Sequence, residues 1–156
     1  MTELTEETKT LVTILNHQRQ VSILLRQFAR MLENRADLHD LSKLSLDEFG
    51  GYVEVNRVAR QFPYGSPEYK ASLKDNKVIE LHFSRNRHHP EHHPGGVNEM
   101  SLIDFIEMVI DWIAASRTYG TTEWEKVIKT QQERFGLTEC QLSVIGLLLE
   151  LFGEGI

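Results

Sequence analysis

The chain has few of the features that mark secreted or membrane-bound proteins. Cys140 is its only cysteine, so no internal disulfide can form, and we expect a reducing, cytoplasmic setting. No apolar run approaches the roughly 18 residues that span a bilayer. The opening segment is too acidic and polar for a signal peptide. The sequence therefore predicts a cytoplasmic protein without a membrane segment.

Positive charge is also scarce. The 156 residues include 17 Lys and Arg against 23 Asp and Glu, which gives a formal net charge of −6 at pH 7. A mildly acidic surface argues against long nucleic acid and membranes as partners. It still allows a local basic pocket to hold a small anion.

The sequence has no alternating strand pattern and no internal repeat. Its apolar residues instead recur at spacings of three and four, which is typical of helices. We predict helices from Glu6 to about Glu33, over 46–60, 67–87 and 100–119, and after caps at Thr122 and Thr138. Asn34 to His39 is interpreted as a break, and Ser45 with Glu48 as the capping box that opens the second helix. The short connections favour an all-α fold, a compact single-domain bundle of five to seven helices over 1–156. Its C-terminal helical pair covers 121–152, and the last helix either packs internally or offers a homodimer face.

All seven histidines lie between His17 and His93. His39 and Asp40 are adjacent, and an imidazole beside a carboxylate suits a divalent ion when the pair sits at a turn or helix end. The alternative is a helix-capping Asp40 beside a surface histidine. His17 falls on the apolar stripe of the first helix, where it is either a ligand or a core histidine bonded to a backbone carbonyl.

A second histidine group lies in the segment LHFSRNRHHPEHHPGG. His82, Arg85, Asn86 and His89 share one helical face for as long as the helix lasts, and Pro90 disfavours helix at His89. His88, His89, His92 and His93 follow within six residues, and one or two of these four are expected to bind metal while the rest face solvent or substrate. The alternative is a solvated polar loop.

Three acids share one side of an almost wholly apolar helix: Asp104, Glu107 and Asp111. A helix that is apolar all round is buried, and buried acids must be neutralised. A metal ion is the favoured remedy. Ion pairs with Arg19, Arg26, Arg30 or Arg117 are the alternative.

Taken in order, these residues resemble the H…HD…H…H…D pattern of the HD-domain superfamily. DLHDLSK is similar to its HD-x-x-K segment, EMVIDWIAASR to the segment of its final aspartate, and HHPEHHPGG to the HH-E…G segment of the HD-GYP branch, without the GYP triplet. The chain also resembles a small family of phage and bacterial HD-like proteins. In that family HDLSK, an aromatic-Tyr-Gly turn (here Phe62, Tyr64 and Gly65), N-x-HH and E-M-x-x-D-W recur. The resemblance covers about residues 14 to 117.

The resemblance implies an all-α fold whose ligands converge from separate helices around one or two divalent ions, among Mn, Fe, Co, Ni, Zn or Mg. Carried over by position, the basic metal site comprises His17, His39, Asp40 and Asp111. His82 with His88 or His89 extends it to a second ion, and Asp104 is an alternative to Asp111. The spacing from His82 to His89 is shorter than the superfamily's, so these ligands are not assigned one by one.

The favoured activity is metal-dependent hydrolysis of a nucleotide or another small phosphate ester. Lys43, Arg85 and Arg87 are expected to hold the anionic substrate, and Glu107 or Asp104 to orient the water, with Lys43 also near the reacting group. The alternatives are a di-iron oxygenase of the HD type and a non-catalytic nucleotide-binding protein, such as a phage-encoded inhibitor. In a purely structural alternative, the acids and histidines only pair with one another.

Overall fold

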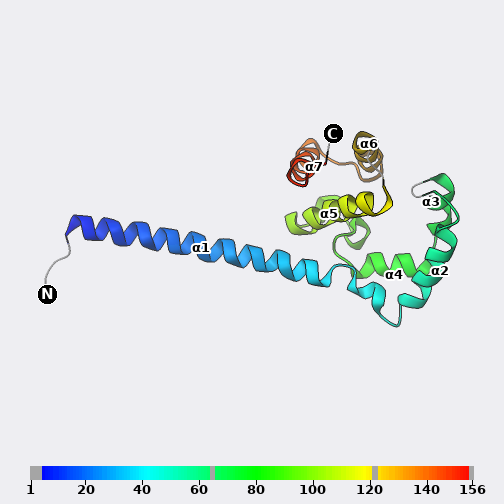
Figure 1. The fold of residues 1–156 in the computed structure, drawn as a ribbon, viewed down its shortest axis with the longest axis horizontal. Coiled ribbons are helices and arrows are strands. Elements are labelled where there is room, and N and C mark those ends of the chain that lie inside the picture. The colour runs from blue at the N-terminus through cyan, green and yellow to red at the C-terminus, as the bar shows by residue number, and fades with distance from the viewer. Residues whose placement is uncertain (1–4, 64–65, 121–122, 155–156) are drawn as a thin grey trace. The chain divides into compact units, whose positions relative to one another are not determined.

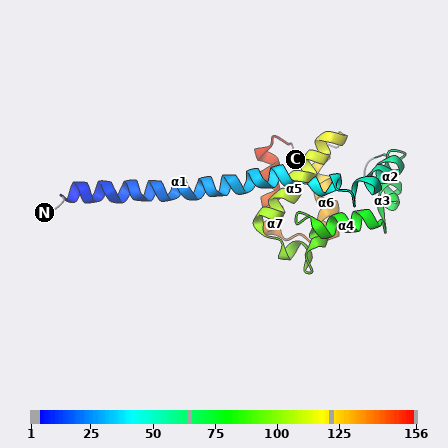
Figure 2. The same cartoon turned by 90° about the horizontal axis from the view of Figure 1, so that it is seen from below.

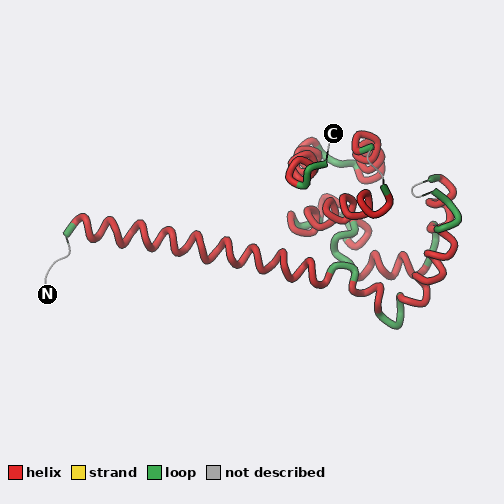
Figure 3. Tube along the Cα trace, in the orientation of Figure 1, coloured by secondary structure: helices red, strands yellow, loops and turns green. Residues whose placement is uncertain are grey.

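The computed structural model describes residues 5–63, 66–120 and 123–154, and in these it is helical throughout, without a strand (Figure 3). The predicted all-α class is confirmed. The seven α-helices of the described residues are α1 (Glu6–Leu38), α2 (Phe49–Ala59), α3 (Pro67–Leu73), α4 (Lys77–Arg85), α5 (Leu102–Tyr119), α6 (Trp124–Phe135) and α7 (Glu139–Leu151). Three short 3₁₀-helices lie between them: η1 (Leu41–Leu44), η2 (Pro90–His92) and η3 (Gly96–Glu99). By its internal contacts the chain divides into two units, residues 1–39 and 40–156.

The first unit is essentially one long helix, α1, which runs unbroken through the predicted break at Asn34 (Figures 1 and 2). Thr5 caps its start by accepting a hydrogen bond from the Thr8 backbone N–H. The segment 34–38 contains no Gly or Pro, so nothing in the backbone ends the helix there. The chain leaves helical geometry only at His39, the C-cap.

Two predicted helix boundaries in the second unit are wrong. Ser45 does not open α2 but closes η1, and Glu48 makes no capping bond, because its side chain turns inward. The helix predicted over 67–87 is two helices, α3 and α4. Asp75 between them has a left-handed φ of 54°, and Asn76 starts α4 by accepting a bond from Val78 N–H. A local polar cap therefore outcompetes helix continuation.

The core of the second unit lies among α5, α6 and α7, which are seen together in Figure 1. Phe105, Met108 and Val109 of α5 are buried against Ile145 and Leu149 of α7. The last helix thus packs internally along one face, as one of the two sequence alternatives proposed.

The ends of these helices are set by local chemistry. Gly120 and Gly136 close α5 and α6 in the left-handed conformation, and Thr138, a predicted cap, forms a capping box with Gln141. Thr122 lies outside the described residues. Leu147 and Leu151 remain exposed on the other side of α7. Among the described residues, no helix is both long and apolar enough to cross a membrane.

Candidate metal centre

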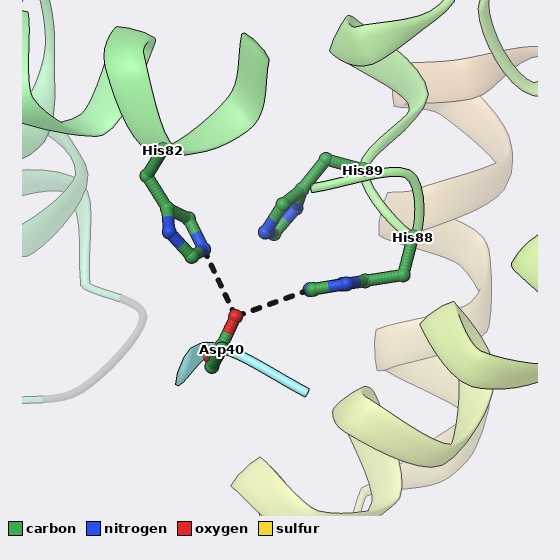
Figure 4. A group of neighbouring side chains, drawn as sticks. All are labelled: Asp40, His82, His88 and His89. Atoms are coloured by element: carbon green, nitrogen blue, oxygen red, sulfur yellow. Dashed lines mark ion pairs between the residues drawn. The ribbon is translucent and has the colours of Figure 1, made fainter. Parts of the chain in front are cut away.

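Four side chains of the second unit converge on one point (Figure 4). Asp40 precedes η1, His82 lies on the last turn of α4, and His88 and His89 lie in the loop that follows. One oxygen or nitrogen atom from each residue lies within 4.8 Å of the others. The sequence predicted Asp40 and His82 as ligands, together with either His88 or His89, and the fold brings all four side chains together.

The backbone at Asp40 aims its carboxylate into this group. Its φ of 56° and ψ of 11° are left-handed, a conformation that aspartate tolerates better than most residues. One oxygen, Oδ1, lies 3.0 Å from His82 Nε2 and 3.4 Å from His88 Nε2, the two contacts dashed in Figure 4. The other oxygen, Oδ2, pairs with Lys43 Nζ.

The loop after α4 contributes both His88 and His89 to the group because the helix stops early. Helix α4 ends at Arg85, and the side-chain amide nitrogen of its C-cap residue, Asn86, donates to the His82 backbone carbonyl at 2.8 Å. His89 then takes an extended conformation, with φ −96° and ψ 127°, as its position before Pro90 requires. His88 and His89 therefore leave the helical face on which the sequence had placed His89 and turn back towards His82.

Three side chains lie within hydrogen-bond distance of His82 Nδ1: Glu48 at 3.0 Å, Asn86 at 3.0 Å and Ser42 at 3.2 Å. Asn86 Nδ2 also lies 2.8 Å from both the His82 carbonyl and Ser42 Oγ. Ser42 then donates its hydroxyl hydrogen to Glu48 Oε2 at 3.0 Å. An ionised Glu48 only accepts, so its 3.0 Å contact with His82 Nδ1 favours the tautomer with the hydrogen on Nδ1. In this tautomer of neutral His82 the lone pair lies on Nε2, the atom that faces Asp40.

Glu48 is the buried anion beneath His82. It has no exposed surface, and Arg85 Nη1 donates to its second oxygen at 3.2 Å. Arg85 also pairs with the exposed Asp47 at 2.8 Å. These contacts satisfy a charge that would otherwise be costly to bury.

His88 has a similar arrangement on its far nitrogen. Its Nδ1 lies 3.3 Å from Glu107 Oε1 on α5, while its Nε2 points at Asp40. A carboxylate on the remote nitrogen is the usual companion of a metal-binding histidine, because it fixes the ring and makes the near nitrogen more basic. Two of the three histidines in the group have such a companion.

His89 completes the group in a largely apolar position. Its ring lies 4.5 Å from Phe83 and 4.1 Å from His88, centroid to centroid. Burial, followed by the charges of His88 and His82, lowers the pKa of His89 to about 2, so the ring is neutral at physiological pH. Its Nε2 is buried without a hydrogen-bond partner among the described residues.

The electrostatics favour an anionic Asp40. Burial by itself raises the pKa of its carboxyl, but hydrogen bonds from the His82 and His88 rings in their protonated form, together with Lys43, outweigh it and hold the pKa well below the usual range. Burial, together with the charges of Asp40 and Glu48, raises the pKa of the nearby Tyr52 hydroxyl. The group thus offers one anionic oxygen and imidazole nitrogens.

These atoms have the spacing of metal ligands. Two atoms each about 2.1 Å from one ion lie about 3.0 Å apart at a right angle and about 3.4 Å apart at the tetrahedral angle. The two contacts of Asp40 Oδ1 have these lengths. A neutral His82 would place its lone pair against the carboxylate, and this contact is attractive only when a proton or a cation lies between them. The residues therefore fit a divalent ion.

Asp111 and Lys43 border this centre. A ligand atom of Asp111, on α5, lies within 4.8 Å of one on His88. Lys43 is partly exposed, and its ammonium lies 5.2 Å from the centroid of the Tyr52 ring. Both were singled out from the sequence, Asp111 as a ligand and Lys43 as a group that contacts substrate.

His17 is not brought to this centre. It lies in α1, which has no buried residue within the first unit. An uninterrupted helix puts it about 30 Å from Leu38. The two residues from there to Asp40 span at most about 7 Å, so His17 and Asp40 of one chain cannot share an ion. His39, the last residue of the first unit, stays a predicted ligand.

Asp104 and Arg87 are bonded to each other rather than to the centre. Asp104 is fully buried, and its oxygens accept from Arg87 at 3.3 and 2.9 Å. It also forms the capping box of α5 with Ser101. Asp104 is therefore neutralised by an ion pair, which was the alternative to a metal ion. Its partner is Arg87, a residue that was expected to hold the substrate. Arg85 is likewise engaged by acids, Asp47 and Glu48.

Sequence reasoning missed Glu48 and Ser42. Glu48 was assigned to a capping box, and Ser42 had no assigned role. The spacing of Glu48 from Ser45 suits a cap, and only the turn at η1 directs its side chain inward. The local sequence pattern does not distinguish a helix-capping Glu48 from a Glu48 whose side chain turns inward.

The comparisons with known proteins give a family and no activity. The model of a family described as "Family of unknown function (DUF5662)" matches residues 6–150. No curated protein and no solved structure matches the chain. The resemblance to the HD-domain superfamily therefore stays a prediction.

Proposed function

The chain belongs to the family of unknown function DUF5662, and because that description names no reaction, we propose from the site itself that the protein is a divalent-metal-dependent phosphohydrolase. One observation carries the metal-binding part of this proposal: Asp40, His82, His88 and His89 place their ligand atoms within 4.8 Å of one another. The carboxylates behind His82 and His88 add support, since they hold both rings in the orientation that a ligand needs.

The donor set narrows the choice of ion. Three imidazoles and one carboxylate suit Zn²⁺, Fe²⁺, Co²⁺, Ni²⁺ or Mn²⁺, whereas Mg²⁺ prefers oxygen ligands and water. When bound, such an ion lowers the pKa of a coordinated water towards neutrality and polarises a phosphoryl oxygen. Hydrolysis is proposed because this chemistry needs no further cofactor.

Lys43 is the residue proposed to contact the substrate. Its ammonium lies beside Asp40 and is partly exposed, so an incoming phosphate oxygen can exchange for part of the Asp40 contact. Arg85 and Arg87 are not assigned this role, because Glu48 and Asp104 already hold their guanidinium groups. Asp111 and Glu107 surround His88 with negative charge and are proposed to accept protons there.

The substrate is proposed to be a nucleotide or another small phosphate ester. The net charge of −6 makes a long polyanion an unfavourable partner, and a single lysine suffices for one phosphoryl group. The HD-domain resemblance points to the same class of substrate.

The test combines metal analysis of untagged protein with a screen of phosphate esters in added Mn²⁺, Co²⁺ or Ni²⁺. We expect about one or two bound ions per chain and metal-dependent release of phosphate. Asp40→Asn is the critical variant, because asparagine tolerates the left-handed backbone while removing the anionic oxygen. It should lower turnover by more than about 100-fold and keep the helical content.

Other outcomes would point elsewhere. Tightly bound iron with oxygen-dependent turnover would replace hydrolysis by an oxygenase activity. A nucleotide that binds tightly and is recovered unchanged would indicate a binding protein. Metal-free protein that also fails to take up added metal would contradict the centre itself.

A further inference from the structure

Glu48 is a fully buried acid beside the centre, and it contacts no proposed substrate or ion. Its side chain has no exposed surface, and three donors surround it: Ser42 Oγ, His82 Nδ1 and Arg85 Nη1. Burying a carboxylate costs several kcal/mol unless it is fully bonded. A carboxylate kept in such a place needs a role that an apolar side chain could not fill.

We infer that Glu48 is a positioning residue that holds His82 in the tautomer whose Nε2 binds the ion. This inference rests on the metal centre of the proposed function. Asn86 Nδ2 and Ser42 Oγ lie 3.0 and 3.2 Å from His82 Nδ1, but each has a shorter contact elsewhere, Asn86 at 2.8 Å with the His82 carbonyl and Ser42 at 3.0 Å with Glu48. A ring hydrogen on Nδ1 turns the 3.0 Å contact with the Glu48 carboxylate into a hydrogen bond, and this is the tautomer that we assign to neutral His82.

The opposite tautomer would disable the ligand. With its hydrogen on Nε2, neutral His82 would donate to Asp40 Oδ1 at 3.0 Å and present no lone pair to an ion. Its bare Nδ1 would then face the Glu48 carboxylate, two acceptors 3.0 Å apart in a site without water access. The charge of Glu48 disfavours this arrangement.

Arg85 and Asp47 extend the arrangement to the surface. Arg85 balances the charge of Glu48 from one side while it pairs with the exposed Asp47. Asp47 is 65% exposed. It therefore offers a matched control next to Glu48 in the chain, with the same change of charge on substitution.

The experiment compares Co²⁺ binding by the full chain in wild type, Glu48→Gln and Asp47→Asn, using the visible spectrum of the ion and chelator competition. Glutamine has one accepting oxygen where glutamate has two, so it cannot satisfy all three donors. We expect the Glu48→Gln variant to bind Co²⁺ about 10- to 100-fold more weakly. Asp47→Asn should stay within about twofold of wild type, because its contact is exposed.

A second readout separates positioning from general stability. Nitrogen NMR of the His82 ring in the zinc-loaded wild type should show the proton on Nδ1. Helical content without metal should be the same in all three proteins. If Glu48→Gln does not fold, Ser42→Ala serves instead. It removes one donor from Glu48 and should weaken Co²⁺ binding severalfold.

The failures are distinguishable. A wild-type chain that binds no Co²⁺ would contradict the metal centre of the proposed function. A wild type that binds, together with a folded Glu48→Gln or Ser42→Ala variant of equal affinity, would overturn only the role of Glu48. A ring proton found on Nε2 in the zinc-loaded protein would overturn it as well.

Discussion

Single residues at the centre hold backbone conformations and ionisation states that a regular helix in water would not give them. Asp40 is left-handed, and His89 is extended before a proline. These two departures turn their side chains out of the helical direction and towards His82. The same enclosure keeps His89 neutral.

The neutrality of His89 predicts how stability depends on pH in metal-free protein. In the unfolded chain a histidine gains a proton below about 6.5. In the folded chain the pKa of His89 is lowered to about 2, chiefly by burial. Between these values the unfolded state binds more protons, so the contribution of His89 is complete above about pH 6.5 and is lost progressively as the pH falls.

We therefore expect the free energy of unfolding of chelator-treated protein to fall between pH 6.5 and 4, by up to about 1.4 kcal/mol per pH unit from this residue. His89→Phe should show a shallower slope over that range, measured by urea unfolding at successive pH values. Between pH 7 and 9 the two proteins should have similar slopes, which serves as the control. Parallel slopes from pH 6.5 to 4 would contradict the buried, neutral state of His89.

Among the elements, α5 depends on an acid at its start. Asp104 completes the capping box with Ser101, and its buried charge is matched by Arg87 in the loop that carries His88 and His89. The pair thus ties the start of a core helix to the histidine loop. It accounts for a buried acid that the sequence analysis had placed among the catalytic residues.

Arg87→Gln should therefore lower stability without removing a metal ligand. Asp104 keeps its bonds to Ser101 but loses its ionic partner, and we expect a cost of about 1–3 kcal/mol in the free energy of unfolding. Arg57→Gln is the matched control, because Arg57 pairs with Glu54 in an exposed contact on α2. It should cost less than about 1 kcal/mol. Equal losses in urea unfolding would show that the buried Arg87–Asp104 pair contributes no more to the free energy of unfolding than the exposed Arg57–Glu54 pair.

For the whole molecule, the centre joins segments that are far apart in the sequence. Asp40 is separated by more than forty residues from His82, and Glu107 of α5 stands behind His88. An ion that binds only when these segments are assembled must stabilise the folded chain. Its binding energy adds to the apolar core of α5 and α7.

A metal titration tests this linkage. At a free metal concentration about 100 times the Kd, the ion should add about 2.7 kcal/mol to the free energy of unfolding. That raises the Tm by about 5 to 10 °C for a chain of this size. Asp40→Asn, which keeps the backbone conformation, should show little of this rise in calorimetry. A Tm that metal leaves unchanged in wild type would contradict an assembled site.

The sequence by itself determined what depends on near neighbours. Helical content follows from apolar spacing, and the ends of α5, α6 and α7 follow from Gly120, Gly136 and Thr138, because caps and left-handed glycines act within one turn. The density of histidine, with the HD pair, also placed the four residues that lie together among its candidate ligands, with the choice between His88 and His89 left open. These signals depend on neighbouring residues or on composition, so they can be read directly from the sequence.

The tertiary structure decided which acid faces which histidine. Glu48 was predicted to cap a helix and Asp104 to lie near the metal, yet Glu48 lies beneath His82 and Asp104 pairs with Arg87. His17 shares the type of the ligands but lies far from Asp40 along a continuous helix. Electrostatic contacts depend on distance in space, and the turns at Asp40 and Asn86 set those distances without any trace in helical periodicity.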